Sequence, residues 1–157
     1  MTKFRDVIDR ASTLWRDYRL DKWYNTDESV YYTFLEGLML NSIDMFDGCL
    51  TSLEYEEITE TEEDGEVVTQ YAFTNTLSSK EIYILALGIM IAWMENNKND
   101  ITQMNLHLSS KDFKNYSEAN HLKSKQESLD RMREDYGRNI TEYQLRNFTT
   151  LPFFGGV

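Results

Sequence analysis

The residues that could do chemistry by themselves are few and lie far apart. The two histidines, His107 and His121, are 14 positions apart, and neither has a second ligand at the spacing of a zinc site on a helix. Cys49 is the single cysteine, so the chain cannot form an internal disulfide or a cysteine-based zinc cluster. The sequence has no GxGxxG or GxxxxGK[ST] phosphate loop and no GxSxG nucleophile motif. We therefore expect no catalytic, cofactor-binding or metal-binding residues, and the protein is predicted not to be an enzyme.

Paired carboxylates are present, but their setting does not favour acid–base catalysis. Glu56-Glu57 and Glu62-Glu63 fall in a segment that alternates as β-strands do. Adjacent strand residues point to opposite faces of a sheet, so neither pair is expected to form a catalytic dyad. The same acidic run lacks the DxDxDG spacing of a calcium-binding loop.

The negative charge is concentrated in the middle of the chain. The net charge of the 157 residues is −11, and residues 25–100 hold 16 acids against two bases. The 13 residues 54–66 hold eight acids and no base. Such a chain is a poor candidate for wrapping nucleic acid or binding an anionic membrane. The acidic run is interpreted either as a solvated hairpin or as a negative surface past which DNA slides without sticking.

No segment is predicted to enter a membrane. The longest apolar run, Ile82 to Met94, has 13 residues, which is too short for a bilayer. The first residues mix charges and lack the apolar core of a signal peptide. We expect the protein to be made in the cytosol.

The hydrophobic periodicity predicts a mainly α fold, a small helical bundle with a long C-terminal helix and a β-hairpin insertion, in a single domain spanning residues 1–157. Helices are expected at residues 4–19, 28–47, 79–95, 100–108 and 117–137. Residues 51–74 alternate and contain Asp64-Gly65, which predicts an acidic hairpin with a turn at that pair. Gly48 is the expected stop of the second helix.

The segment 79–95 is apolar almost all round, which predicts a central helix buried on several sides. Ser78 and Glu81 have the spacing of a capping box, and Gly88 indicates close packing against another helix. The long C-terminal helix is expected to pack along a seam with three- and four-residue steps: Ala119, Leu122, Gln126, Leu129, Arg133, Tyr136, Ile140 and Tyr143.

The last residues, about 148–157, form an unusual tail. Two adjacent phenylalanines beside Gly-Gly should not remain in water, so the tail is expected to dock on a surface. The surface is either a partner protein or the chain's own core. The residues assigned to this contact are Leu151, Phe153, Phe154 and Val157.

From Leu77 onward the sequence resembles the head–tail adaptors of long-tailed bacteriophages, also called connector or head-completion proteins. The resemblance lies in a capped "E-I-x-x-L-A" helix with a late tryptophan, followed by "S-K-D-F-x-x-Y-S-x-A-N-H-L". Residues 34–46 resemble the second helix of that family, and the resemblance covers roughly residues 30–136. The residues that carry the motif are Leu77, Ser78, Glu81, Ile82, Leu85, Ala86, Trp93, Ser110, Lys111, Asp112, Phe113, Tyr116, Ser117, Ala119, Asn120, His121 and Leu122.

The resemblance implies a structural virion protein in the neck, assembled in the host cytoplasm. Such subunits form a homo-oligomeric ring, usually of 12 copies, between the portal protein and a tail-side neck protein. The ring extends a channel through which DNA passes without sequence-specific binding, and the family has no catalytic residues.

Two positions remain open for the acidic hairpin, the DNA channel and a contact with the next subunit. The residues concerned are Glu57, Glu60, Glu62, Glu63, Asp64 and Glu66. Alternatives for the whole chain are another neck or tail-completion protein, an acidic helical regulator that mimics DNA, and an enzyme without known motifs.

Overall fold

The computed structural model describes residues 1–15, 17–61, 65, 67–108 and 115–148. Within residues 98–108, 115–122 and 147–148 it describes the backbone and not the side chains. Everything reported below refers to these residues.

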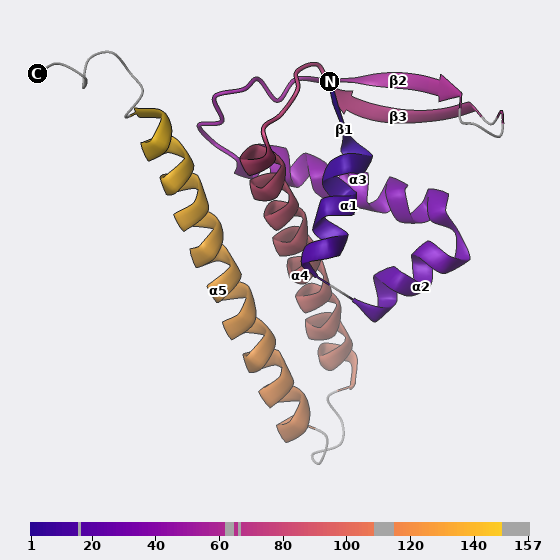
Figure 1. Cartoon of the computed structure of the whole chain (residues 1–157). Coiled ribbons are helices and arrows are strands. Elements are labelled where there is room, and N and C mark those ends of the chain that lie inside the picture. Colours follow the sequence, from indigo (N-terminus) through magenta and orange to yellow (C-terminus); the bar gives the residue numbers. More distant parts are fainter. Residues whose placement is uncertain (16, 62–64, 66, 109–114, 149–157) are drawn as a thin grey trace, which may run out of the picture.

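Helices dominate the structure, which confirms the predicted mainly α fold with a long C-terminal helix and a hairpin. Two long helices, α4 and α5, lie side by side in antiparallel orientation, and three shorter helices pack beside α4 (Figure 1). The helices are α1 (Phe4–Leu14), α2 (Tyr18–Thr26), α3 (Glu28–Met45), α4 (Ser79–Leu108) and α5 (Asn115–Phe148).

A small antiparallel sheet lies at the end of the molecule where α4 begins (Figure 1). The predicted hairpin is present as β2 (Tyr55–Thr61) and β3 (Val67–Phe73), and Gly65 between them has a φ of 87° that favours glycine. A third strand, β1 (Thr2–Lys3), pairs with β3, so the order is β1-β3-β2. Sequence patterning did not predict β1 because two residues show no alternation.

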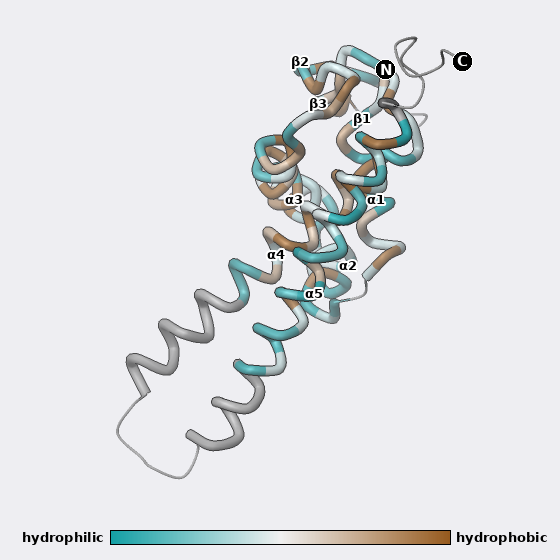
Figure 2. Tube along the Cα trace, turned by 90° about the vertical axis from the view of Figure 1, so that its left-hand side faces the viewer, coloured by the Kyte–Doolittle hydropathy of each residue, from teal (hydrophilic) through white to brown (hydrophobic). Residues whose placement is uncertain are grey.

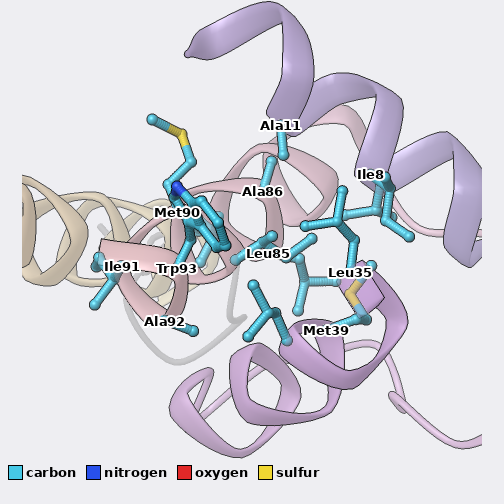
Figure 3. Packing of buried hydrophobic residues seen from close by; sticks show 14 of the residues in the cluster. Ile8, Ala11, Leu35, Met39, Leu85, Ala86, Met90, Ile91, Ala92 and Trp93 are labelled. Atoms are coloured by element: carbon cyan, nitrogen blue, oxygen red, sulfur yellow. The ribbon is translucent and has the colours of Figure 1, made fainter. Parts of the chain in front are cut away.

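The central helix α4 supplies more buried hydrophobic side chains to the core than any other described element. Its side chains are buried in several directions, as predicted from its composition, because α1, α3 and α5 all pack on it. Figure 3 shows side chains of α1, α3 and α4 converging, with Ile8 of α1 and Leu35 of α3 beside Leu85 of α4. In Figure 2 the most hydrophobic parts of the tube lie in the shorter helices, α4 and the sheet, whereas α5 is mostly hydrophilic.

Helices α3 and α4 pack closely at Gly88, as expected from the sequence. A Cβ atom placed on Gly88 would lie 2.9 Å from the Ser42 Cβ. Ser42 is fully buried, and its hydroxyl donates a hydrogen bond to the Leu85 carbonyl oxygen at 2.7 Å. The two helices therefore pack with a serine of one against a glycine of the other.

Helix α5 attaches through one stripe of side chains. Leu129, Tyr136 and Tyr143 are buried at seven-residue intervals, with Met132 and Ile140 partly buried between them. The predicted seam is confirmed at Leu129, Tyr136, Ile140 and Tyr143, and the spacing is that of coiled-coil packing. It is wrong at Arg133, which is exposed, and Met132 packs on the core instead.

The predicted first helix, 4–19, is wrong at its C-terminal end. The backbone becomes extended at Trp15 (φ −148°, ψ 136°), and a separate helix, α2, starts at Tyr18. Asp17 explains the break, because its carboxylate caps α2 by accepting the Arg19 backbone N–H at 2.7 Å. The segment 20–27, expected to be a connection, is therefore mostly helical.

Three other boundaries are corrected. The expected helices 79–95 and 100–108 are one continuous helix, α4. The asparagines between them each disfavour a helix by only about 0.7 kcal/mol, less than helix packing can supply. The long helix begins at Asn115 and passes through Gly137 to Phe148, where 117–137 was expected. Tyr143 lies beyond Gly137 and is buried, so packing maintains the helix there.

Candidate interaction surface

The hairpin is fixed to the body by a cluster of aromatic rings on one face of the sheet. Phe4, the first residue of α1, is fully buried. Its ring centroid lies 5.2 Å from that of Tyr55, 5.7 Å from that of Tyr71 and 4.8 Å from that of Phe73. Such ring pairs add about 0.5–1.5 kcal/mol each beyond simple burial. The base of the hairpin is thus held rigidly although β2 is at the sheet edge.

On the opposite face, Glu60 is clamped by two polar side chains. The Lys3 ammonium lies 2.5 Å from the Glu60 carboxylate, and the Gln70 amide donates to the same oxygen at 2.9 Å. The hydrogen bond from Lys3 is the main reason why the pKa of Glu60 is lowered. Lys3 belongs to β1, so this contact crosses β3 and ties the outer strand to the N-terminus.

The structure separates the predicted hairpin acids. Glu57 is exposed on the face that carries Tyr55 and Tyr71, whereas Glu60 lies on the opposite face with Gln70. The remaining acids assigned to this surface, Glu62, Glu63, Asp64 and Glu66, lie outside the described residues. The described part of the hairpin is therefore an acidic outer strand beside the uncharged strand β3.

Ser78 and Glu81 cap the start of α4. Ser78 donates its backbone N–H to the Glu81 carboxylate at 2.7 Å, and the Glu81 N–H donates to the Ser78 hydroxyl at 3.3 Å. This is the predicted capping box at the start of α4. Leu77 precedes it and is buried.

The role of Glu81 beyond the cap was not predicted. The carboxylate is 3% exposed and accepts a hydrogen bond from the Tyr143 hydroxyl at 2.6 Å, which links α4 to α5. Tyr143 also accepts the Leu50 N–H at 3.1 Å, which ties in the segment between α3 and β2. Burial opposes ionisation of Glu81, but hydrogen bonds from Tyr143, Thr51 and Ser78 together outweigh it and lower its pKa to about 2. Through these hydrogen bonds, Glu81 connects the start of α4 with α5 and with the segment between α3 and β2.

Cys49 lies beside Glu81 and is a weak nucleophile. Burial, with the charge of Glu81 next in size, raises the pKa of its thiol to about 11. The thiolate is the reactive form, so the environment suppresses its chemistry.

Trp93 joins α4 to α1, α2 and α3. Its side chain is 4% exposed, and its indole N–H donates to the Asp17 carboxylate at 3.2 Å. The rings of Trp15, Trp23 and Phe34 lie within 6.3 Å of the Trp93 ring, measured between centroids. The hydrogen bond to the capping residue of α2 explains why this short helix is fixed although none of its side chains is buried.

Several sequence-predicted residues cannot be placed. Lys111, Asp112 and Phe113 lie outside the described residues, and so do Leu151, Phe153, Phe154 and Val157 of the tail. Ser117, Asn120 and Leu122 lie on α5 in a stretch without described side chains. The structure therefore brings together the motif residues Leu77, Ser78 and Glu81, and places Trp93 farther along the same helix.

A small pocket lies where α1 and α2 meet α3 and α4. Trp15, Asp17, Tyr31, Met90 and Trp93 are among its lining residues. Its free volume of about 30 Å³ has room for about two water molecules. An ordinary ligand site has about 300–1,000 Å³, so this pocket is a packing gap of the helical body.

The described residues show neither a metal-binding cluster nor a membrane-spanning helix. Among the described residues, no group of three or more histidine, cysteine, aspartate or glutamate side chains is placed to hold a metal ion. No helix in the described ranges is long and apolar enough to span a membrane. No protein family, curated protein or solved structure was found to match this chain.

Proposed function

We propose that the protein is a structural subunit of a bacteriophage neck that forms a ring between the portal and the tail, and that it has no enzymatic activity. The observation that carries this proposal is the acidic hairpin, which is anchored firmly at its base by the Phe4 ring cluster while β2 remains at the sheet edge. The sheet is supported at this base, but its outer strand remains unpaired and can accept a strand of a partner. The resemblance of residues 77–122 to head–tail adaptors supports the identity of the assembly.

The charge of the chain supports a role in which DNA passes without binding. The net charge of −11 disfavours phosphate contacts, on which nucleic-acid affinity depends.

Of the two positions open to the hairpin, we favour the contact with the next subunit. Its described strands expose unpaired backbone N–H and C=O groups as well as carboxylates. Such an edge can form hydrogen bonds with a strand of another chain.

The proposed partners are further copies of the chain, usually 12 in the family it resembles, together with the portal protein and a tail-side neck protein. The portal or a neighbouring copy is the proposed docking surface for Leu151, Phe153, Phe154 and Val157. The proposed location is the virion neck.

The proposal is tested by mixing the purified chain with rings of the portal protein from the same virus. We expect a stoichiometric ring of the chain on one end of the portal in electron micrographs, and no retention of duplex DNA by the chain alone at physiological salt. The DNA-mimic alternative would instead be supported if the chain does not bind the portal but binds a DNA-binding host protein in competition with DNA.

A further inference from the structure

The pairing of β2 with β3 shows which backbone groups of the hairpin face outward. The Thr74 N–H donates to the Glu54 carbonyl oxygen at 2.9 Å, so these two opposed residues form a hydrogen-bonded pair. Hydrogen-bonded and non-hydrogen-bonded pairs alternate along an antiparallel ladder. With the one-to-one register of the two strands, the N–H and C=O groups of residues 56, 58 and 60 face those of 72, 70 and 68. Those of residues 55, 57, 59 and 61 on β2, and of residues 67, 69 and 71 on β3, face away from the partner strand.

Both outer edges of the hairpin are open over most of their length. On the β3 side, β1 pairs only with Phe73 and Ala72, and the chain then turns into α1 at Phe4. The edge of β3 at residues 67–71 therefore has no paired strand among the described residues, and β2 has none along its whole outer side. Figure 1 shows the hairpin reaching out from the end of the body, with the short β1 at its base.

The edge of β3 lacks most of the features that prevent strand addition, whereas β2 has charge as its one protection. Natural edge strands are protected by charged side chains, prolines, bulges or short length. Here each strand has seven residues, the register contains no bulge, and neither strand contains lysine or proline. The charges are distributed unequally, because Glu56, Glu57 and Glu60 lie on β2 and β3 has none.

We propose that β2 of one copy adds to the open β3 edge of a second copy, so that hairpins lie side by side in one continuous antiparallel sheet. The unequal charge disfavours the pairing of β2 with β2. Pairing β2 with β2 would place the glutamates of two copies along one seam, whereas β2 on β3 sets them beside uncharged residues. The pairing covers residues 57–61 of β2 and 67–71 of β3, because β1 of the accepting copy already occupies the edge at Ala72 and Phe73. In this register Thr59 lies opposite Thr69 of the next copy.

The contact is head-to-tail, because each copy pairs through its β2 edge with one neighbour and through its β3 edge with the other. Such contacts generate rings when the rotation closes and open filaments when it does not. The inference thus deepens the proposed ring by naming its contact, but it concerns the chain alone and can be measured without portal or virus.

The test blocks each edge separately with proline. Thr59→Pro removes an outward N–H from β2, and Thr69→Pro removes one from β3. Neither N–H takes part in the ladder inside the hairpin, so both variants should keep the helical circular dichroism and melting behaviour of the wild type. Thr59→Val and Thr69→Val keep the N–H groups and serve as controls.

We expect the average mass of the full chain, measured by sedimentation, to rise with concentration for the wild type and both valine controls. Each proline variant should stay monomeric. A mixture of the two, one labelled with ¹⁵N, should give a 1:1 heterodimer and nothing larger by native mass spectrometry, because one intact β2 edge meets one intact β3 edge.

Three results would overturn the inference: a wild type that is monomeric at every concentration, proline variants that associate like the wild type, or a mixture without heterodimer. Association by Thr69→Pro alone would indicate β2–β2 pairing instead. None of these results bears on whether the chain occupies the neck, which is decided on virus particles.

Discussion

At the scale of single residues, Glu81 makes stability depend on pH. Its pKa of about 2 in the folded protein lies below the value of 4.5 of a free glutamate. The ionised form therefore stabilises the fold at pH values above 4.5, and this contribution is lost as the pH falls from 4.5 toward 2. The difference between the two pKa values corresponds to on the order of 3 kcal/mol.

We expect Glu81→Gln to lower the free energy of unfolding at pH 7 and to flatten its decline between pH 4.5 and 2. Urea unfolding at a series of pH values measures both effects. The exposed Glu134→Gln is the control and should leave the curve within about 0.5 kcal/mol of the wild type. Parallel curves for Glu81→Gln and the wild type would contradict the assigned role.

Two buried tyrosines of α5 make a matched pair. Tyr143 donates its hydroxyl hydrogen to Glu81, whereas the buried hydroxyl of Tyr136 has no hydrogen-bond partner among the described residues. Tyr143→Phe should cost about 1.5–3 kcal/mol, since it removes a hydrogen bond to a charged group. Tyr136→Phe should be neutral or stabilising by about 1 kcal/mol. Equal losses for the two variants, measured by chemical denaturation, would refute this distinction.

Glycine positions test the contact between α3 and α4. Gly88→Ala forces a methyl group against Ser42 and should cost about 1–3 kcal/mol. Gly37→Ala is the matched control, because it lies on an exposed part of α3 with nothing within 4 Å of the added carbon. It should stabilise the helix by up to about 1 kcal/mol. Thermal melting of both variants distinguishes the close approach from a general effect of alanine.

At the scale of elements, α5 depends on its narrow stripe of buried side chains. Leu129→Ala should destabilise the protein by about 2–5 kcal/mol, since Leu129 is 2% exposed. Leu145→Ala makes the same change on the same helix at a side chain that is 59% exposed, and should have an effect of at most about 0.5 kcal/mol. Similar losses for both would mean that α5 packs on a different face.

The elements that sequence patterning predicted well are those with long apolar periods or strong turn residues. The capping box at Ser78 and the hairpin around Gly65 depend on residues close together in the chain, so the sequence alone predicted them. The strand β1 and the break before α2 depend on distant partners, namely β3 and Trp93. Local propensity alone does not contain such contacts.

Much of the candidate surface also depends on tertiary contacts. The sequence indicated an acidic hairpin, but the clamp of Lys3 on Glu60 joins residues 57 positions apart. The burial of Glu81 beside Tyr143 likewise joins positions separated by 62 residues. A signal for the second contact existed in part, because Tyr143 belongs to the predicted seam and Glu81 to the predicted cap.

At the scale of the whole molecule, we expect the C-terminal tail to act in assembly more than in folding. Buried residues of α5 extend to Tyr143, before the tail begins. Deleting residues 151–157 should leave the melting temperature close to that of the full chain and abolish docking on portal rings. Loss of the fold on deletion would show that the tail belongs to the protein's own core.

The protein has a helical body that carries an acidic hairpin with two open and unequally charged edges. The body is stabilised by α4, and the sheet is fixed to it through Phe4 and Lys3. The open edges are the surfaces that the described part of the chain leaves to other molecules. We propose that they form the contacts between copies in a ring.

The most direct measurement is cryo-electron microscopy of virus particles that contain this chain, with mass spectrometry to identify it. The account predicts a ring of the protein between portal and tail, with hairpins of neighbouring subunits side by side. Absence of the chain from the particle, or a location away from the neck, would contradict it.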